Sequence, residues 1–209
     1  NWIALMGWSY DDRTEFFNLA DLVEKFNLEK VNPAPAAINF TKLDYFNGLH
    51  IRSISYSDLA KRVKPFLVQA GLVVDDEKLI KVAPIIQERI ATLDEVVPMA
   101  GFFFRDDVIP EVNELIAKGL TSTQTLEIVR KCLQVVTEGG EITHEKIEAP
   151  LRAFAEQAGF SAGQVFGVLR VAVTGQKVSP PLLESMEIIG FEIVIKRISK
   201  AIELLMNAE

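Results

Sequence analysis

The sequence predicts an all-α fold. Apolar residues recur at alternating steps of three and four along several segments, most clearly over 188–205, which places them on one face of a helix. Glycines such as Gly71 and Gly159 follow the ends of these apolar stripes, where helices commonly stop. No alternating pair of strands joined by an Asn-Gly or Asp-Gly turn occurs. We therefore expect helices from about residue 57 onward.

The first 57 residues are the least regular part of the chain. Residues 2–6 are apolar and are expected to continue a helix, so that the chain reads as a piece of a longer protein. Pro33 and Pro35 forbid a helix nearby, because proline lacks the N–H group and restricts the residue before it. A compact helical unit with a tight connector is the predicted structure.

Capping residues mark where the later helices begin. Side chains that accept hydrogen bonds from the first helical N–H groups precede the apolar stripes at Asp75, Thr121, Thr143 and Ser161. Ser179 before Pro180 predicts one more helix start. We expect two domains, 1–56 and 57–209, with a further division of the second near 138–142 as an option.

Composition limits the class of protein. The chain has 209 residues, 49% of them hydrophobic and 24% charged, which is typical of a globular protein. Its longest uncharged run, 157–169, is shorter than the roughly 20 residues that span a membrane, so no membrane partner is expected. Cys132 is the one cysteine, which fits a reducing compartment such as the cytoplasm. The net charge of −7 argues against DNA or a nonspecific nucleic-acid coat.

No catalytic group stands out from the residues alone. His50 and His144 are the two histidines, too few for a three-histidine metal site. His144 and Glu148 imitate part of a zinc-protease helix, but an ordinary first helical turn is the favoured interpretation. Cys132 lies among apolar residues and is expected to be a buried thiol. We expect no catalytic residue, no metal and no cofactor in this chain.

Charge is unevenly distributed. Residues 42–64 hold five basic and two acidic side chains, interleaved with aromatic rings, and residues 167–183 contain Arg170 and Lys177 without an acid. A solvated helix face explains either segment separately. Together they permit a surface that contacts a nucleic-acid backbone despite the negative total.

Several short motifs occur in a characteristic order. They are NWIALMGWS at 1–9, FNLEKV at 26–31, KLDYFNG at 42–48, LRVAVTG at 169–175 and VSPPLLE at 178–184. In this combination the chain resembles the C-terminal part of bacterial-type glutamyl-tRNA synthetases, a class I aminoacyl-tRNA synthetase family. It departs from the family at Asn32–Ala36, where a Lys-Ser pair is usual, and at Ile38–Asn39.

The resemblance implies an architecture and a partner. A small helical stem-contact domain would be followed by a helical anticodon-binding domain of two subdomains. The family's HIGH and KMSKS signatures do not occur in this chain, so ATP and Mg²⁺ would act in a separate catalytic domain. The expected partner is a tRNA for glutamate, with glutamine tRNA left open, bound by a monomer in the bacterial cytoplasm or an organellar matrix. The alternative function is a helical protein–protein adaptor without tRNA affinity.

The resemblance also implies roles for single residues. Arg89, which precedes Thr92–Leu93, would read the third anticodon base; an ion pair with Glu88 or Glu95 is the alternative. The residues implied to lie around the anticodon loop are Arg170, Lys177, Ser179, Pro180 and Leu182. Those implied to meet tRNA backbone phosphates are Lys42, Arg52, Lys61 and Lys64.

Overall fold

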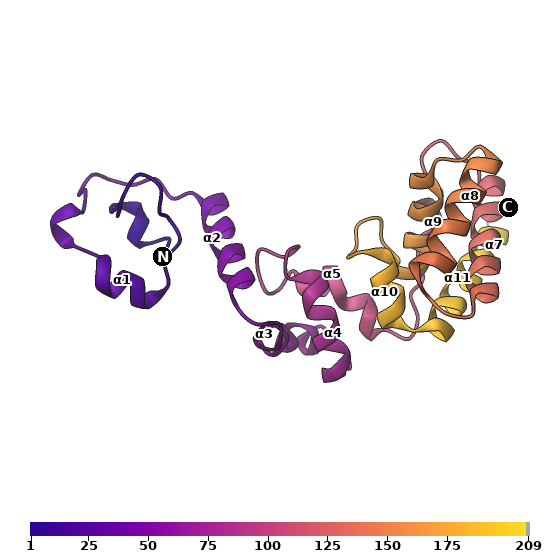
Figure 1. The fold of residues 1–209 in the computed structure, drawn as a ribbon, viewed down its shortest axis with the longest axis horizontal. Helices are drawn as coiled ribbons and strands as arrows, with labels where there is room; N and C mark the ends of the chain where they lie inside the picture. The colour runs from indigo at the N-terminus through magenta and orange to yellow at the C-terminus, as the bar shows by residue number, and fades with distance from the viewer. Residues whose placement is uncertain (208–209) are drawn as a thin grey trace.

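The computed structural model describes residues 1–207. These residues form helices and connecting loops with no strand, so the predicted all-α class is confirmed. Figure 1 shows three parts that follow one another in a row: an N-terminal part, a middle group of helices and a C-terminal bundle. None of the described helices is long and apolar enough to cross a membrane.

The N-terminal part is held together by aromatic rings. It contains η1 (Ala4–Met6), α1 (Leu19–Lys25) and η2 (Leu28–Lys30), and α2 (Phe40–Ser53) leads out of it. The buried Trp8 ring lies 5.6 Å from that of Phe17 and 5.4 Å from that of Phe26. The predicted helix over residues 2–6 is wrong, because only one 3₁₀ turn forms before the chain bends to place Trp8 in this cluster.

The middle part consists of α3 (Tyr56–Gln69), α4 (Asp76–Ile86), α5 (Val96–Ala100) and η3 (Gly101–Phe104). Asp75 caps α4 as predicted, since its side chain accepts a hydrogen bond from the Lys78 N–H. Phe102 and Phe103 are buried and belong to the hydrophobic core.

The C-terminal bundle is built from α6 (Val112–Leu115), α7 (Ser122–Gly139), η4 (His144–Glu148), α8 (Ala149–Ala158), α9 (Ala162–Thr174) and α11 (Phe191–Met206). The predicted caps Thr121, Thr143 and Ser161 are confirmed. The turn at 138–142 joins helices that pack against each other. The domain limits stay predictions, and this packing favours a division near 105–111 instead.

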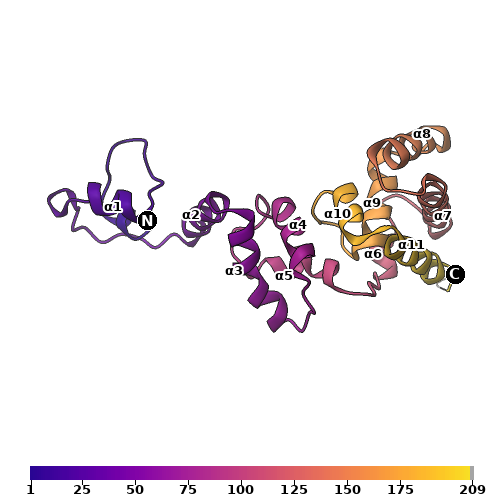
Figure 2. The ribbon, with the colours of Figure 1, turned by 60° about the horizontal axis from the view of Figure 1, so that its bottom comes forward.

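Helix α10 (Leu182–Ile189) connects the bundle to the middle part. It packs against α4, η3 and α11. Figures 1 and 2 show α10 between the middle helices and the bundle. The helix start expected at Ser179–Pro180 is wrong: α10 begins at Leu182, after Pro181, and Ser179 is buried in the preceding loop.

The apolar stripe over 188–205 does not form one helix. Gly190, with φ 95°, separates α10 from α11. The buried face of α11 also differs from the expected one, because it contains Arg197, whereas Ile195 and Ile202 are only partly buried. A charged side chain in the core is a feature that apolar periodicity does not predict.

Candidate nucleic-acid interface

The turn that carries Arg89 is held in place by its neighbours. The buried Gln87 Nε2 donates to the carbonyl oxygens of Ile51 at 2.9 Å and Ile54 at 2.8 Å, at the end of α2. The Glu95 carboxylate accepts hydrogen bonds from the N–H groups of Ala91 and Thr92. Asn47 of α2 donates to the Ala91 carbonyl oxygen. Arg89 therefore projects from a turn that is fixed on both sides.

The Arg89 side chain is exposed and has no ion pair or hydrogen bond to another described side chain. The alternative of an ion pair with Glu88 or Glu95 does not form. Glu88 instead lies 3.8 Å from Arg52, and Glu95 is occupied by backbone N–H groups. The guanidinium of Arg89 is consequently available to an external ligand.

Arg170 lies on α9 and organises the loop that follows this helix. Its Nη1 donates to the Ser179 hydroxyl at 2.5 Å, to the Ser179 carbonyl oxygen at 3.4 Å and to the Pro180 carbonyl oxygen at 3.0 Å. The side chains of Ser179, Pro180 and Leu182 are buried, so they do not lie on the surface where unpaired bases would pack. This loop presents Lys177 and the 73% exposed Val178 instead.

Arg89 lies within electrostatic range of Arg170, although the two residues belong to different parts of the molecule. Burial lowers the pKa of Arg170, and the positive charge of Arg89 lowers it further. Two cations within electrostatic reach of each other attract an anionic partner. Lys177 lies in the loop after Arg170 and forms an ion pair of 2.9 Å with Glu114 on α6.

The four side chains expected to contact tRNA phosphates all have acidic partners. The ion pairs are Lys42–Glu15 at 2.7 Å, Arg52–Glu88 at 3.8 Å, Lys61–Asp58 at 4.0 Å and Lys64–Asp76 at 2.8 Å. At least part of each side chain is exposed, so a phosphate can compete for it.

Two further exposed arginines are candidates for the same surface. Arg62 and Arg105 have no side-chain partner among the described residues. Arg62 belongs to the basic run around Lys61 and could have been selected on that signal. Nothing in the sequence around Arg105 marks it as a candidate site residue. It lines a hollow of about 320 Å³ beside Gln176, whose buried Nε2 lacks a hydrogen-bond partner.

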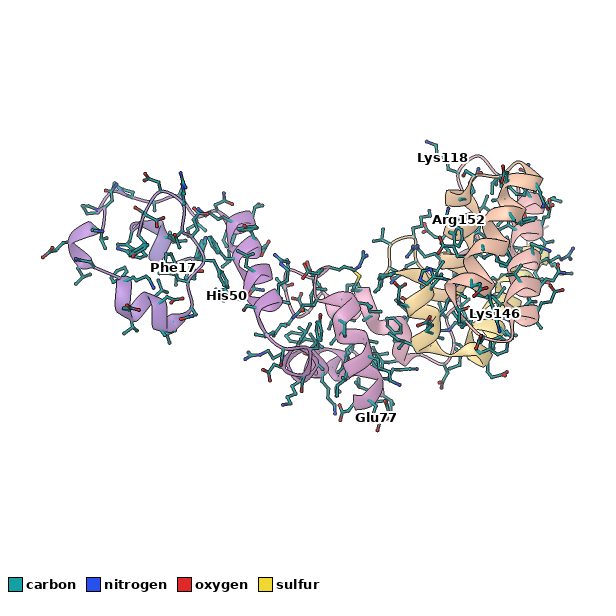
Figure 3. The ribbon with its side chains drawn as sticks, viewed as in Figure 1. Phe17, His50, Glu77, Lys118, Lys146 and Arg152 are labelled. Atoms are coloured by element: carbon teal, nitrogen blue, oxygen red, sulfur yellow. The ribbon has the colours of Figure 1, made fainter. Side chains whose placement is uncertain are left out.

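The described residues offer binding groups rather than a nucleophile. Cys132 is fully buried, and burial raises the pKa of its thiol to about 12. The His144 imidazole is engaged with Glu148 at 2.7 Å. His50 lies on α2 (Figure 3), and its ring is 4.7 Å from that of Phe16.

The all-helical fold, with Arg89 on a turn after α4 and Arg170 on α9, is suited to binding an anionic partner. Residues 58–202 match the family model described as the anticodon binding domain, and the chain belongs to that family. The proteins that it resembles along its length are glutamate–tRNA ligases, which confirms the predicted resemblance.

The chain is 38% identical to the glutamate–tRNA ligase of Roseiflexus sp. strain RS-1, over 96% of this chain and 41% of that protein. It is 35% identical to that of Borreliella burgdorferi, over 98% of this chain and 43% of the relative. The chain thus spans about two fifths of the length of the curated relatives it matches.

Solved structures agree with this assignment. A glutamate tRNA ligase from Elizabethkingia meningosepticum, in complex with its amino acid, superposes with a TM-score of 0.82 at 26% identity, covering 98% of this chain and 41% of that one. The glutamate-tRNA synthetase of Elizabethkingia anophelis gives a TM-score of 0.77 at 25% identity, covering 97% and 40%.

Proposed function

We propose that this chain recognises the anticodon loop and inner corner of a glutamate tRNA on behalf of a glutamate–tRNA ligase. The observation that supports this most strongly is the exposed Arg89, without a side-chain partner among the described residues, on a turn held by its neighbours. Its charge also lowers the pKa of Arg170, which lies far away in the sequence. Both cations lie on the segment that matches the anticodon-binding family. We infer the function from a free guanidinium on a turn held by its neighbours, with a second guanidinium within electrostatic range.

Arg89 reads the third anticodon base. A guanidinium fork can donate to the O2 and N3 acceptors of an unpaired cytosine. Guanine presents N–H donors on the corresponding edge, so a donor would face a donor and that complex would be disfavoured. This contrast favours glutamate tRNA over glutamine tRNA.

The remaining predicted residues have supporting roles. Arg170 holds the Ser179–Pro180 backbone in place, so that this loop and Lys177 present a fixed surface to the anticodon. Lys42, Arg52, Lys61 and Lys64 exchange their acidic partners for phosphates, which adds salt-dependent affinity without sequence information.

Bond formation belongs to the rest of the ligase. ATP and Mg²⁺ would act there, since this chain spans only about two fifths of the length of the glutamate–tRNA ligases that it matches. This chain contributes binding energy and specificity to a ligase that we place, as a monomer, in the bacterial cytoplasm, with an organellar matrix as the alternative.

The test is a titration of the chain with glutamate tRNA and with a variant whose third anticodon base is changed from C to G. Binding is measured at two salt concentrations and should weaken as salt is added. The affinity for the C form should exceed that for the G form by about tenfold, which corresponds to one well-placed hydrogen bond. Arg89→Gln should remove the preference for C. Arg130→Gln, which removes an exposed arginine from α7, should preserve it.

Two outcomes would contradict the proposal at different levels. Absence of salt-dependent binding, even at low salt, would overturn tRNA recognition and favour a protein–protein adaptor. Equal affinity for both tRNAs, unchanged by Arg89→Gln, would overturn the base reading by Arg89 alone.

A further inference from the structure

Arg197 joins the two parts of the molecule that carry Arg89 and Arg170. It lies on α11, is 2% exposed, and its guanidinium donates to three backbone carbonyl oxygens. Nη1 donates to Val173 at 2.8 Å, in the last turn of α9. Nη2 donates to Phe102 at 2.8 Å and Arg105 at 2.7 Å, at the end of η3.

These acceptors belong to helix ends. The last carbonyl groups of a helix lack partners within it and carry partial negative charge. A single guanidinium therefore satisfies open carbonyl groups of α9 in the bundle and of η3 in the middle part. Burial lowers the pKa of Arg197 to about 10, which leaves it charged at neutral pH.

Two further contacts show that this junction is closely packed. A Cβ atom added at Gly175 would lie 2.6 Å from Val108 Cγ1, so the Val108 side chain packs against the Gly175 backbone without space for another side chain. The exposed Lys196 forms an ion pair with Asp107 at 2.6 Å beside them. Arg197 is the buried polar member of this set.

The backbone groups that Arg197 contacts are connected through helices to Arg89 and Arg170. Val173 lies one helical turn after Arg170 on α9. Phe102 follows α5, which packs against α4, and the Arg89 turn connects those two helices. A displacement at the Arg197 contacts would therefore change the separation between the two arginine side chains.

We propose that Arg197 is a positioning residue that sets the distance between Arg89 and Arg170 and thereby the selectivity for anticodon bases. It does not contact tRNA, because its side chain is buried. This inference rests on the proposed function for its effect on tRNA, whereas its effect on the distance between the two parts is independent of tRNA.

The experiment compares Arg197→Met with Arg130→Met. Both variants lose one positive charge, but Arg130 is exposed on α7 and its guanidinium contacts only Met206 among the described side chains. Spin labels at Lys81→Cys and Glu156→Cys, exposed positions on α4 and α8, report the distance between the two parts. The native Cys132 is buried and should remain unlabelled.

We expect one narrow distance distribution in the parent chain and in Arg130→Met, and a broadened or shifted one in Arg197→Met. The preference for C over G at the third anticodon base should fall about tenfold in Arg197→Met only. The salt dependence of binding should match that of Arg130→Met, since neither residue is among the proposed phosphate contacts.

An unchanged distance distribution in folded Arg197→Met would overturn the inference, and so would a changed distribution with unchanged base preference. Circular dichroism establishes folding at the temperature of measurement. If Arg197→Met does not fold, the same measurements are made on Arg197→Lys. This variant keeps the charge, but an ammonium group lacks the planar set of donors that contacts three carbonyl oxygens. If the parent chain binds no tRNA, the proposed function fails, while the label distances still decide whether Arg197 fixes the two parts.

Discussion

At Gly175, both the backbone conformation and a contact with Val108 require a glycine. It ends α9 with φ 75° in the left-handed region, which costs a side-chain-bearing residue about 1–2 kcal/mol. The approach of Val108 excludes a Cβ atom there. Gly159 ends α8 in the same conformation, with φ 74°, but has open space around it.

We therefore predict that Gly175→Ala lowers the free energy of unfolding by more than Gly159→Ala. The shared backbone cost is about 1 kcal/mol, and overpacking against Val108 should add about 1–3 kcal/mol at Gly175 alone. Urea denaturation of both variants measures the difference. Equal losses would show that the Val108 contact relaxes without cost.

At the scale of elements, η4 is a single π-helical turn whose side chains form a short charged network. His144 Nδ1 lies 2.7 Å from Glu148 Oε2, and Arg152 contacts the other carboxylate oxygen at 2.7 Å. The hydrogen bond that protonated His144 donates to the Glu148 carboxylate raises the pKa of His144 and lowers the pKa of Glu148. His50 behaves differently, because burial lowers its pKa.

NMR titration should consequently separate the two histidines, with His144 above and His50 below the ordinary value of 6.5. The contribution of protonated His144 to stability is complete below the unfolded pKa and is lost as pH rises through the raised folded pKa. That of Glu148 is present above its unfolded pKa and is lost as pH falls through its lowered folded pKa. Glu148→Gln should move the pKa of His144 downward and leave that of His50 unchanged. A His50 pKa above that of His144 would contradict these assignments.

Sequence patterns predicted some elements well for a physical reason. Thr121 and Ser161 cap α7 and α9 with side chains that act within three residues, and such local hydrogen bonds are visible in the sequence. The buried face of α11 was not predicted, because Arg197 is stabilised by carbonyl groups of α9 and η3, far away in the chain. The same limit applies to the candidate site. The resemblance suggested Arg89 and Arg170 individually, but only folding brings them within electrostatic range of each other.

At the scale of the whole molecule, the three parts are connected by a few polar side chains. Gln87 joins the middle part to the end of α2, as Arg197 joins it to the bundle. In both cases a buried donor satisfies carbonyl groups at the end of a helix in the neighbouring part. Such donors are costly to lose, since the acceptors stay buried without partners.

Gln87→Leu should therefore lower the free energy of unfolding by about 1–3 kcal/mol, the cost of unsatisfied buried acceptors. Amide hydrogen exchange should also accelerate at the end of α2, where Ile51 and Ile54 lose their donor. Glu88→Gln is the control, since it removes only a partly exposed ion pair with Arg52, worth about 0–1 kcal/mol. Equal effects of the two substitutions would contradict this role of Gln87.

The three parts of the molecule follow one another in a row, and this affects which nucleic acids the protein can bind. Lys42 at the start of α2, Arg89 in the middle and Arg170 in the bundle belong to successive parts, each with its own helices (Figure 1). Under the proposed function, a polyanion reaches all three only if its own backbone follows a matching path. Curvature and length of the nucleic acid would then be read alongside its bases, and a linear strand carrying the correct triplet would remain a poor ligand.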